Sequence, residues 1–106
     1  MKQTTFSDRV IKIALSIPKG RVTTYGRIAR AAGAGPMASQ SITSILSKAA
    51  QAGAKIPFHR IVYANGTIWI DEPHRAERMN LYKKEGIEVD DKNKIKNFWD
   101  ILLEFK

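Results

Sequence analysis

The sequence predicts a single α+β domain of small winged-helix type, in which a helix-turn-helix is followed by a β-hairpin wing. Segments 24–33 and 37–50 carry apolar residues at helical spacing, and a short glycine-containing turn joins them. Asn65-Gly66 lies between two runs of β-branched and aromatic residues, which is the strongest short-range signal for a hairpin. A formal net charge of +8 on 106 residues favours a polyanionic partner, with nucleic acid as the leading candidate.

Length and composition limit the domain count and the class of protein. A chain of 106 residues with 43% hydrophobic and 26% charged residues fits one soluble domain, spanning residues 1–106, without repeats or linkers. The basic balance alone is also compatible with solubility needs or with an anionic membrane. No run approaches the roughly 18 apolar residues of a membrane span, and the N-terminus has no apolar signal region, so we expect a cytoplasmic protein without membrane contact.

The sequence contains no cysteine. This excludes disulfides, thiolate metal sites and a cysteine nucleophile. No other grouping of residues suggests a metal or an organic cofactor, and we expect a monomer that binds neither.

The first elements are predicted from a cap and a helical apolar stripe. Thr5 followed by Asp8 resembles a capping box, and apolar residues at helical spacing continue from Phe6 to Ile17. Pro18-Lys19-Gly20 provides turn chemistry, and the three residues after it allow only a small strand.

The helix-turn-helix prediction depends on Thr24 as an N-cap and on Gly33 as the residue that ends the first helix. Ala34-Gly35-Pro36 then breaks the chain before a helix that begins at Met37 or Ala38 and ends at Ala50. Helix pairs of this kind also occur in domains that bind no nucleic acid. The apolar stripe of the second helix is Ile42, Ile45, Leu46 and Ala49, and its small polar face is Gln40, Ser41, Thr43, Ser44, Ser47 and Lys48.

Beyond the predicted wing at 61–70, Pro73 suits a first helical turn, so residues 74–85 are predicted as a charged helix that Gly86 ends. Asp90-Asp91 is interpreted as the cap of a final helix. The apolar face of that helix, which includes Ile95, Phe98, Trp99, Leu102 and Leu103, either covers the core or docks a partner, and we favour the core.

The most distinctive stretch is the hydrophobic run 55–62, which an aromatic, an imidazole and a guanidinium interrupt at Phe58, His59 and Arg60. Pro57 restricts the backbone before Phe58 and biases it toward extended geometry. On residue types alone, these three residues would be a core aromatic, a structural histidine and a surface charge.

Pro57-Phe58-His59-Arg60, followed by Ile61-Val62, resembles the Pro-Cys-His-Arg-Val signature of the O6-alkylguanine-DNA alkyltransferases, with phenylalanine in place of the alkyl-accepting cysteine. It is also similar to the alkyltransferase-like proteins, which usually carry tryptophan there and bind O6-alkylguanine in DNA without repairing it. The resemblance extends from about Phe6 to Glu88. It implies a non-enzymatic protein that binds the lesion in duplex DNA through the minor groove, flips the base and hands it to nucleotide-excision repair proteins.

The resemblance implies a set of DNA contacts. Tyr25 matches the tyrosine that contacts the phosphate beside the target nucleotide, and Gln40 aligns with the family's arginine finger if one residue is inserted between Gly33 and Pro36. Glutamine lacks the charge and the flat guanidinium of that finger. The predicted DNA-binding residues are Tyr25, Gln40, Ser41, Ser44 and Arg60.

The resemblance also implies a lesion pocket bounded by Phe58, Tyr25, Leu46 and Trp69, although the residue type by itself favours a core or interface role for Trp69. Asp71 stands where alkyltransferase-like relatives place a stacking arginine. His59 and Glu85 match the relay that activates the cysteine in true alkyltransferases, and we interpret them here as a pair that stiffens the pocket. The predicted pocket residues are Phe58, His59, Leu46, Trp69, Asp71 and Glu85.

Two other functions remain open from the sequence. The protein could be a general DNA-binding module without lesion specificity, as Gln40 and Asp71 would allow. It could also be an enzyme that uses His59 and Glu85 as a base, although the sequence offers no evident nucleophile or metal cluster for such a reaction.

Overall fold

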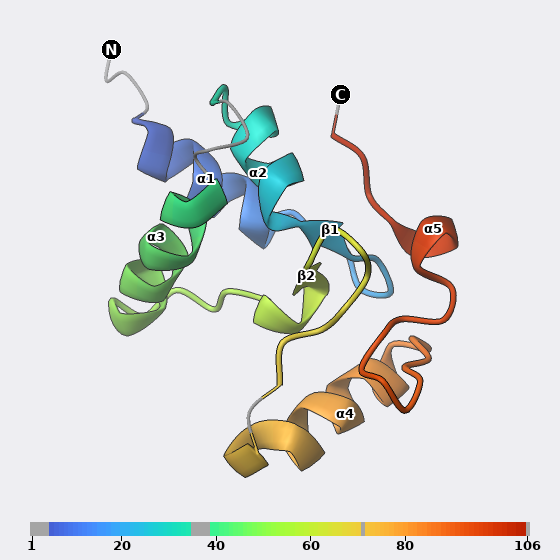
Figure 1. Ribbon diagram of the computed structural model, residues 1–106. Helices are drawn as coiled ribbons and strands as arrows, with labels where there is room; N and C mark the ends of the chain where they lie inside the picture. Colours follow the sequence, from blue (N-terminus) through green and yellow to red (C-terminus); the bar gives the residue numbers. More distant parts are fainter. Residues whose placement is uncertain (1–4, 35–38, 71, 106) are drawn as a thin grey trace.

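Two short parallel strands lie between the three N-terminal helices and helix α4 (Arg75–Lys84) (Figure 1). The described residues form two hydrophobic cores, and the second of these strands contributes to both. The computed structural model describes residues 5–34, 39–70 and 72–105. Strand β1 (Thr23–Thr24) pairs with β2 (Ile61–Val62), with Thr23 opposite Ile61 and Thr24 opposite Val62. Because successive side chains of a strand point to opposite faces, Ile61 enters the N-terminal core and Val62 the C-terminal core.

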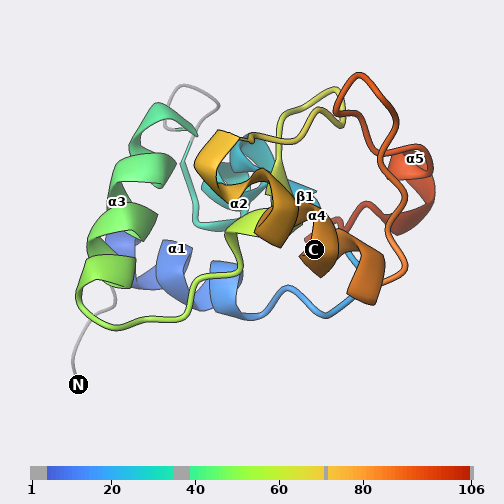
Figure 2. The same cartoon turned by 90° about the horizontal axis from the view of Figure 1, so that it is seen from below.

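The N-terminal core is built by α1 (Phe6–Leu15), α2 (Tyr25–Ala31) and α3 (Ser39–Gln51), which pack against one another (Figure 2). The capping box is confirmed: the Thr5 hydroxyl accepts from the Asp8 backbone N–H, and the Asp8 carboxylate accepts from that of Thr5. Helix α1 ends at Leu15, two residues before the predicted end, and the Ser16 hydroxyl donates to the Ile13 carbonyl at 2.6 Å. Ile17 is still buried.

The boundaries of α2 are as predicted. The Thr24 hydroxyl accepts from the Arg27 backbone N–H at 3.2 Å, and Gly33 has a φ of 97° just beyond the last turn. The helix-turn-helix and the α+β class are therefore confirmed. The one-residue insertion before Pro36 concerns positions outside the described residues and stays a prediction.

The predicted β-hairpin wing is wrong in its strand pairing. A turn is present, because the Tyr63 N–H donates to the Thr67 carbonyl at 3.0 Å and Gly66 has a φ of 87°. However, β2 pairs with β1 in parallel, and Thr67 forms an isolated antiparallel bridge with Lys94 instead. The reason is packing: the segment after the turn contributes Ile68 to the C-terminal core, together with the chain at residues 93–95.

Helix α4 (Arg75–Lys84) follows the short 3-10 helix η3 (Glu72–His74), and Gly86 ends it in the left-handed conformation, close to the prediction. The predicted role of Asp90 as a helix cap is wrong. Its Oδ1 accepts from the backbone N–H groups of Lys92 and Lys94, which closes a tight turn.

The final helix α5 (Phe98–Ile101) is a single turn. Ile95 and Phe98 are buried in the core as expected, whereas Trp99 is 75% exposed. The tail then returns to the centre, where Leu102 bridges Val22 in parallel. No described helix has the length and apolar character needed to cross a bilayer.

Candidate functional site

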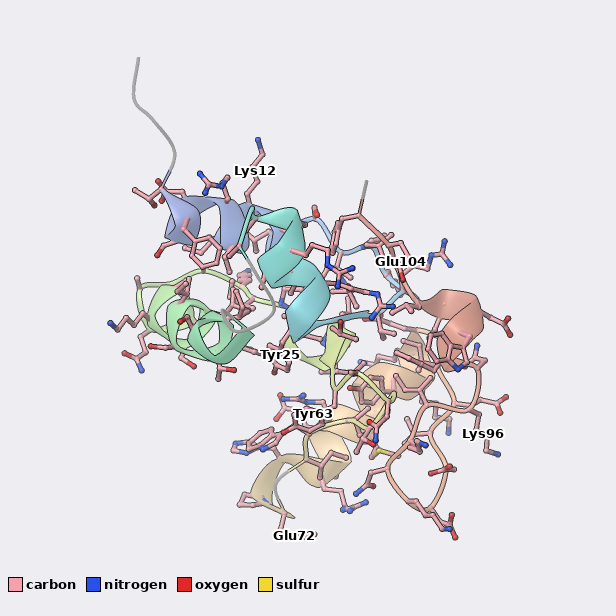
Figure 3. All side chains as sticks on the ribbon, turned by 45° about the horizontal axis from the view of Figure 1, so that its top comes forward. Lys12, Tyr25, Tyr63, Glu72, Lys96 and Glu104 are labelled. Carbon is pink, nitrogen blue, oxygen red and sulfur yellow. The ribbon has the colours of Figure 1, made fainter. Side chains whose placement is uncertain are left out.

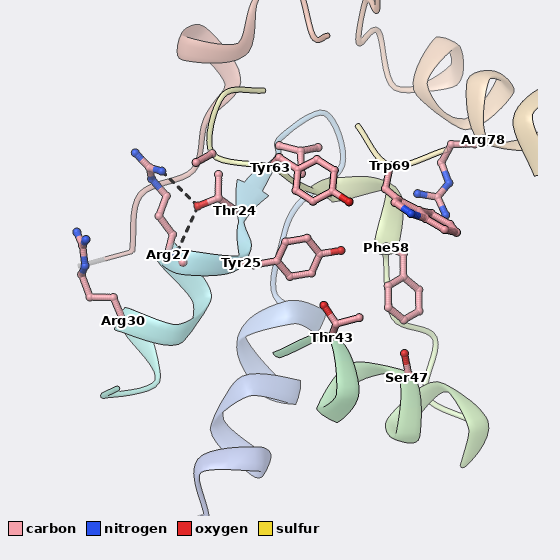
Figure 4. A pocket seen from close by; sticks show the side chains of 13 residues that line it. Thr24, Tyr25, Arg27, Arg30, Thr43, Ser47, Phe58, Tyr63, Trp69 and Arg78 are labelled. Carbon is pink, nitrogen blue, oxygen red and sulfur yellow. Dashed lines mark hydrogen bonds between the residues drawn. The ribbon is translucent and has the colours of Figure 1, made fainter. Parts of the chain in front are cut away.

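A cavity of about 900 Å³ opens between α2, α3, β2 and the chain that follows β2 (Figure 4). Its aromatic lining consists of Tyr25, Phe58, Tyr63 and Trp69. This volume lies in the range of small-molecule sites, and aromatic walls are typical of sites for flat ligands. The cavity is therefore large enough and apolar enough to receive a planar group.

Tyr25 and Tyr63 stand on facing elements, α2 and the segment after β2 (Figure 3). Their ring centroids are 6.3 Å apart, with the planes inclined by 44°. Burial, together with the neighbouring Tyr63, raises the pKa of Tyr25, although Arg78 opposes the shift. The Tyr25 hydroxyl therefore keeps its proton at neutral pH and can donate a hydrogen bond to an anion.

The cavity is electropositive. Arg27, Arg30 and Arg78 line it, and among its described lining residues there is no aspartate or glutamate. The charge of Arg27 is partly neutralised by Glu104, to which its Nε donates at 2.7 Å. Its Nη1 also donates to the Thr24 hydroxyl at 3.2 Å. The positive charge of these arginines attracts polyanions to the opening of the cavity.

Phe58 reaches the cavity from η2 (Phe58–Arg60), a 3-10 turn that interrupts the run predicted to be extended. The turn forms because the Pro57 carbonyl accepts from the Arg60 backbone N–H at 2.9 Å. Its side chains point in different directions as a result: Phe58 lies at the cavity, while Arg60 points to Glu85.

Behind the cavity, Glu85 is the centre of a hydrogen-bonded network. Its side chain is only 5% exposed and accepts from His59 Nε2 at 2.6 Å, from the Arg60 guanidinium at 2.9 Å and from the Gly20 backbone N–H at 2.9 Å. Burial alone would raise the pKa of Glu85, but these hydrogen bonds outweigh it and lower the pKa to about 2. Since the carboxylate is ionised and can only accept, His59 Nε2 carries the proton.

Comparisons with known proteins agree with this geometry. The family model for the DNA-binding domain of 6-O-methylguanine DNA methyltransferase matches residues 5–87. The chain belongs to this family. The family resemblance carried by the Pro57–Val62 stretch is thereby confirmed. The placement of Phe58 at the position of the family's alkyl-accepting cysteine stays a prediction from that signature.

Two relatives in this family are similar along most of the chain. A protein of Escherichia coli named DNA base-flipping protein is 35% identical over 88 residues, which is 83% of this chain and 67% of the relative. Alkyltransferase-like protein 1 of Schizosaccharomyces pombe is 30% identical over 91 residues, which is 84% of this chain and 82% of the relative.

The fold is similar to solved structures of the same family. A crystal structure of the Schizosaccharomyces pombe alkyltransferase-like protein, in complex with damaged DNA containing O6-carboxymethylguanine, has a TM-score of 0.74 and 25% identity and covers 99% of this chain and 100% of that chain. The O6-methylguanine methyltransferase of Mycobacterium tuberculosis has a TM-score of 0.56 and 27% identity, with 79% of this chain matching 50% of that one.

The structure brings part of the predicted set of site residues together. Tyr25, Phe58 and Trp69 line one cavity. Leu46 does not, because it faces the N-terminal core and is fully buried there, so its assignment to the pocket is wrong. His59 lines a neighbouring cavity of about 180 Å³, and Glu85 lies behind it in the network.

Arg60 was predicted to bind DNA, and the structure corrects this to a structural role. Its Nε and Nη2 donate to Glu85, and its Nη1 donates to the Ile17 carbonyl at 3.0 Å. The guanidinium is thus held inside the protein with three of its donor atoms engaged, and its side chain is only 20% exposed.

On α3, the serines Ser41 and Ser44 are exposed, as a surface contact requires. Thr43 and Ser47, one turn apart, line the cavity. Gln40 belongs to the first turn of the same helix, but its side chain is not among the described ones, and Asp71 lies outside the described residues. Their predicted roles stay predictions.

Ten of the residues that line the cavity were not among the predicted site residues. The spacing of Arg27 and Arg30, one helical turn apart, was a usable signal for two of them. Nothing in the sequence pattern pointed to Arg78 or Tyr63, which approach the site through the packing of α4 and the chain reversal after β2. The ten are Thr24, Gly26, Arg27, Arg30, Thr43, Ser47, Val62, Tyr63, Ala64 and Arg78.

Proposed function

We propose that this protein recognises O6-alkylguanine in duplex DNA by holding the flipped base in the aromatic cavity, without removing the alkyl group. One observation carries the proposal. Phe58, which stands at the position of the family's alkyl acceptor, lines the same cavity as Tyr25, Tyr63 and Trp69. A base has two π-faces, and stacking on aromatic side chains stabilises an extruded base without chemistry.

The DNA would approach along α3 and the N-terminus of α2. Small side chains such as Ser41, Thr43 and Ser44 let the helix backbone come close to a minor groove. The Tyr25 hydroxyl, at the start of α2, would donate to the phosphate beside the extruded nucleotide, and Arg30 would add charge at the rim. Both duplex strands and the flipped base could then be contacted from one face.

Absence of alkyl transfer follows from the chemistry of the residues. The phenyl ring of Phe58 has no lone pair that could displace carbon from O6, and the sequence contains no cysteine. The histidine of the family relay has its Nε2 proton committed to Glu85. We therefore propose that His59, Arg60 and Glu85 serve to hold η2, and with it Phe58, in position.

A protein that marks a lesion without repairing it needs another system to remove the damage. We propose that this single domain acts as a monomer and presents the distorted, occupied site to nucleotide-excision repair proteins. The names of the relatives describe base flipping and an alkyltransferase-like character for those proteins. We infer the handover because the sequence contains no cysteine that could accept the alkyl group.

The test is a pair of fluorescence-anisotropy titrations on duplexes of one sequence, with and without a single O6-methylguanine, each at two salt concentrations. We expect a lower Kd for the alkylated duplex at both salt concentrations and a similar salt slope for both duplexes, because the phosphate contacts are shared. Equal affinities would instead identify a general DNA-binding module and would overturn the proposal.

A further inference from the structure

The position of Arg78 suggests which O6 substituents the cavity accepts. Both Phe58 and Arg78 line the large cavity, and both also line the neighbouring cavity of about 180 Å³. If the base is held as proposed, its O6 substituent points to Phe58, since that is where the family's acceptor stands. The substituent would therefore lie beside the Arg78 side chain.

We propose that Arg78 makes the cavity selective for O6 substituents that carry a negative charge, with O6-carboxymethylguanine as the simplest example. This inference rests on the proposed function and names the class of lesion that the same site prefers. An arginine guanidinium binds a carboxylate through two parallel hydrogen bonds, and such bonds are strong in a partly enclosed site.

In the part of the chain that the structure describes, no carboxylate compensates the charge of Arg78. None of the ion pairs among the described residues involves Arg78, and the described lining of the large cavity has no carboxylate. Glu77 lines only the smaller cavity and is exposed. The Tyr82 hydroxyl lies near the guanidinium, but no hydrogen bond of good geometry joins them.

The other two arginines of the cavity are placed for a different role. Arg27 and Arg30 both extend from α2, and Figure 4 shows them on the opposite side of the cavity from Arg78, which lies on the side of Trp69 and Phe58. Arg27 is also held by Glu104. Arg30 therefore serves as a matched control, because it lines the same cavity but lies away from the expected substituent.

The test uses four duplexes of one sequence, containing guanine, O6-methylguanine, O6-carboxymethylguanine or the neutral amide O6-carbamoylmethylguanine at one position. The acid and the amide have nearly the same shape and differ in charge. For the unaltered protein, we expect the acid to bind at least about tenfold more tightly than the amide.

Substitutions of Arg78 and Arg30 show which residue causes the preference for the acid over the amide. In Arg78→Gln the ratio of acid to amide affinity should fall close to one, whereas Arg78→Lys should retain part of it. Arg30→Gln should weaken binding to all four duplexes by a similar factor and leave the ratio in place. Thermal unfolding of each variant checks the fold, and because each ratio is taken within one variant, a general loss of affinity cancels.

The possible results of these titrations distinguish failure of the charge selectivity from failure of the proposed function. If methylated DNA is preferred over plain DNA but the acid and the amide bind equally, the charge selectivity is wrong and the proposed function stands. If the ratio survives in both Arg78 variants, Arg78 is not its source. If no alkylated duplex binds more tightly than the plain one, the proposed function itself has failed.

Discussion

Arg60 and Glu85 connect the two halves of the protein. The Arg60 Nη2 donates to Glu85 Oε2 at 2.9 Å and its Nε lies 3.1 Å and 3.2 Å from the two carboxylate oxygens, while Nη1 reaches the carbonyl of Ile17 at the end of the N-terminal core. The pair joins the end of α4 to η2 and to the segment after α1. Since Phe58 belongs to η2, this pair also fixes one wall of the cavity.

Removing the guanidinium should be costly. In Arg60→Met the Glu85 carboxylate, which is 5% exposed, loses its main partner, and we expect the free energy of unfolding to fall by about 3 kcal/mol. Urea denaturation measures this change. Lys96→Met is the control, because its pair with Glu88 is exposed on both sides and contributes less than about 1 kcal/mol. Similar losses in the two variants would contradict the structural role of Arg60.

Glu85 also predicts how stability depends on pH. Its pKa is about 2 in the folded protein and 4.5 ordinarily. The stabilisation is therefore complete above the unfolded value and is lost as pH falls from about 5 toward 2, because the unfolded chain then binds the proton more readily. Urea midpoints measured from pH 6 to pH 3 should fall more steeply for the natural protein than for Glu85→Gln. Parallel curves would show that Glu85 is not the source.

No alkyl group should move to the protein. After incubation with a stoichiometric O6-methylguanine duplex, the intact mass of the protein should be unchanged, since none of the described residues that line the cavity is an activated nucleophile. The recovered DNA should still contain the modified base. A mass increase of one methyl group on any residue would refute this prediction.

Gly66 should tolerate no side chain, for two separable reasons. Its φ of 87° strains any other residue, and a Cβ there would lie 2.9 Å from Cγ of Phe98. Gly53→Ala is the control, because Gly53 has a φ of 106° but open space around it. By thermal or urea unfolding we expect a loss of about 1 kcal/mol for Gly53→Ala and of about 2–4 kcal/mol for Gly66→Ala. Equal losses would mean that Phe98 does not pack on the turn as described.

The helical half of the fold could be predicted because its signals are local. The capping box at Thr5, the N-cap at Thr24 and the glycine at position 33 each act within a few residues. The pairing of β2 could not, because the parallel partner is β1, 38 positions earlier for Ile61 and Thr23, and the local turn at Asn65-Gly66 favoured the wrong neighbour.

The site residues also divide into those that the sequence indicates and those that only tertiary packing brings together. Phe58, Tyr25 and Trp69 were predicted from the family signature and its spacing, and they line one cavity. Leu46 was misplaced because the resemblance assigned it to the pocket, whereas its place in the apolar stripe of the helix correctly indicated the core. Arg78 could not be predicted, because only the packing of α4 beside η2 brings it to Phe58.

The central claim is that the aromatic cavity holds the alkylated base, and filling the cavity tests it most directly. Ser47 lines the cavity from α3, so Ser47→Trp should occupy the space that the base needs. Gln51→Trp, an exposed position in the last turn of the same helix, is the control. The quantity to measure is the ratio of Kd for the plain duplex to Kd for the O6-methylguanine duplex. We predict that this ratio falls to about one in Ser47→Trp, with plain-DNA binding retained, and is unchanged in Gln51→Trp. An undiminished ratio in Ser47→Trp would show that the base is held elsewhere.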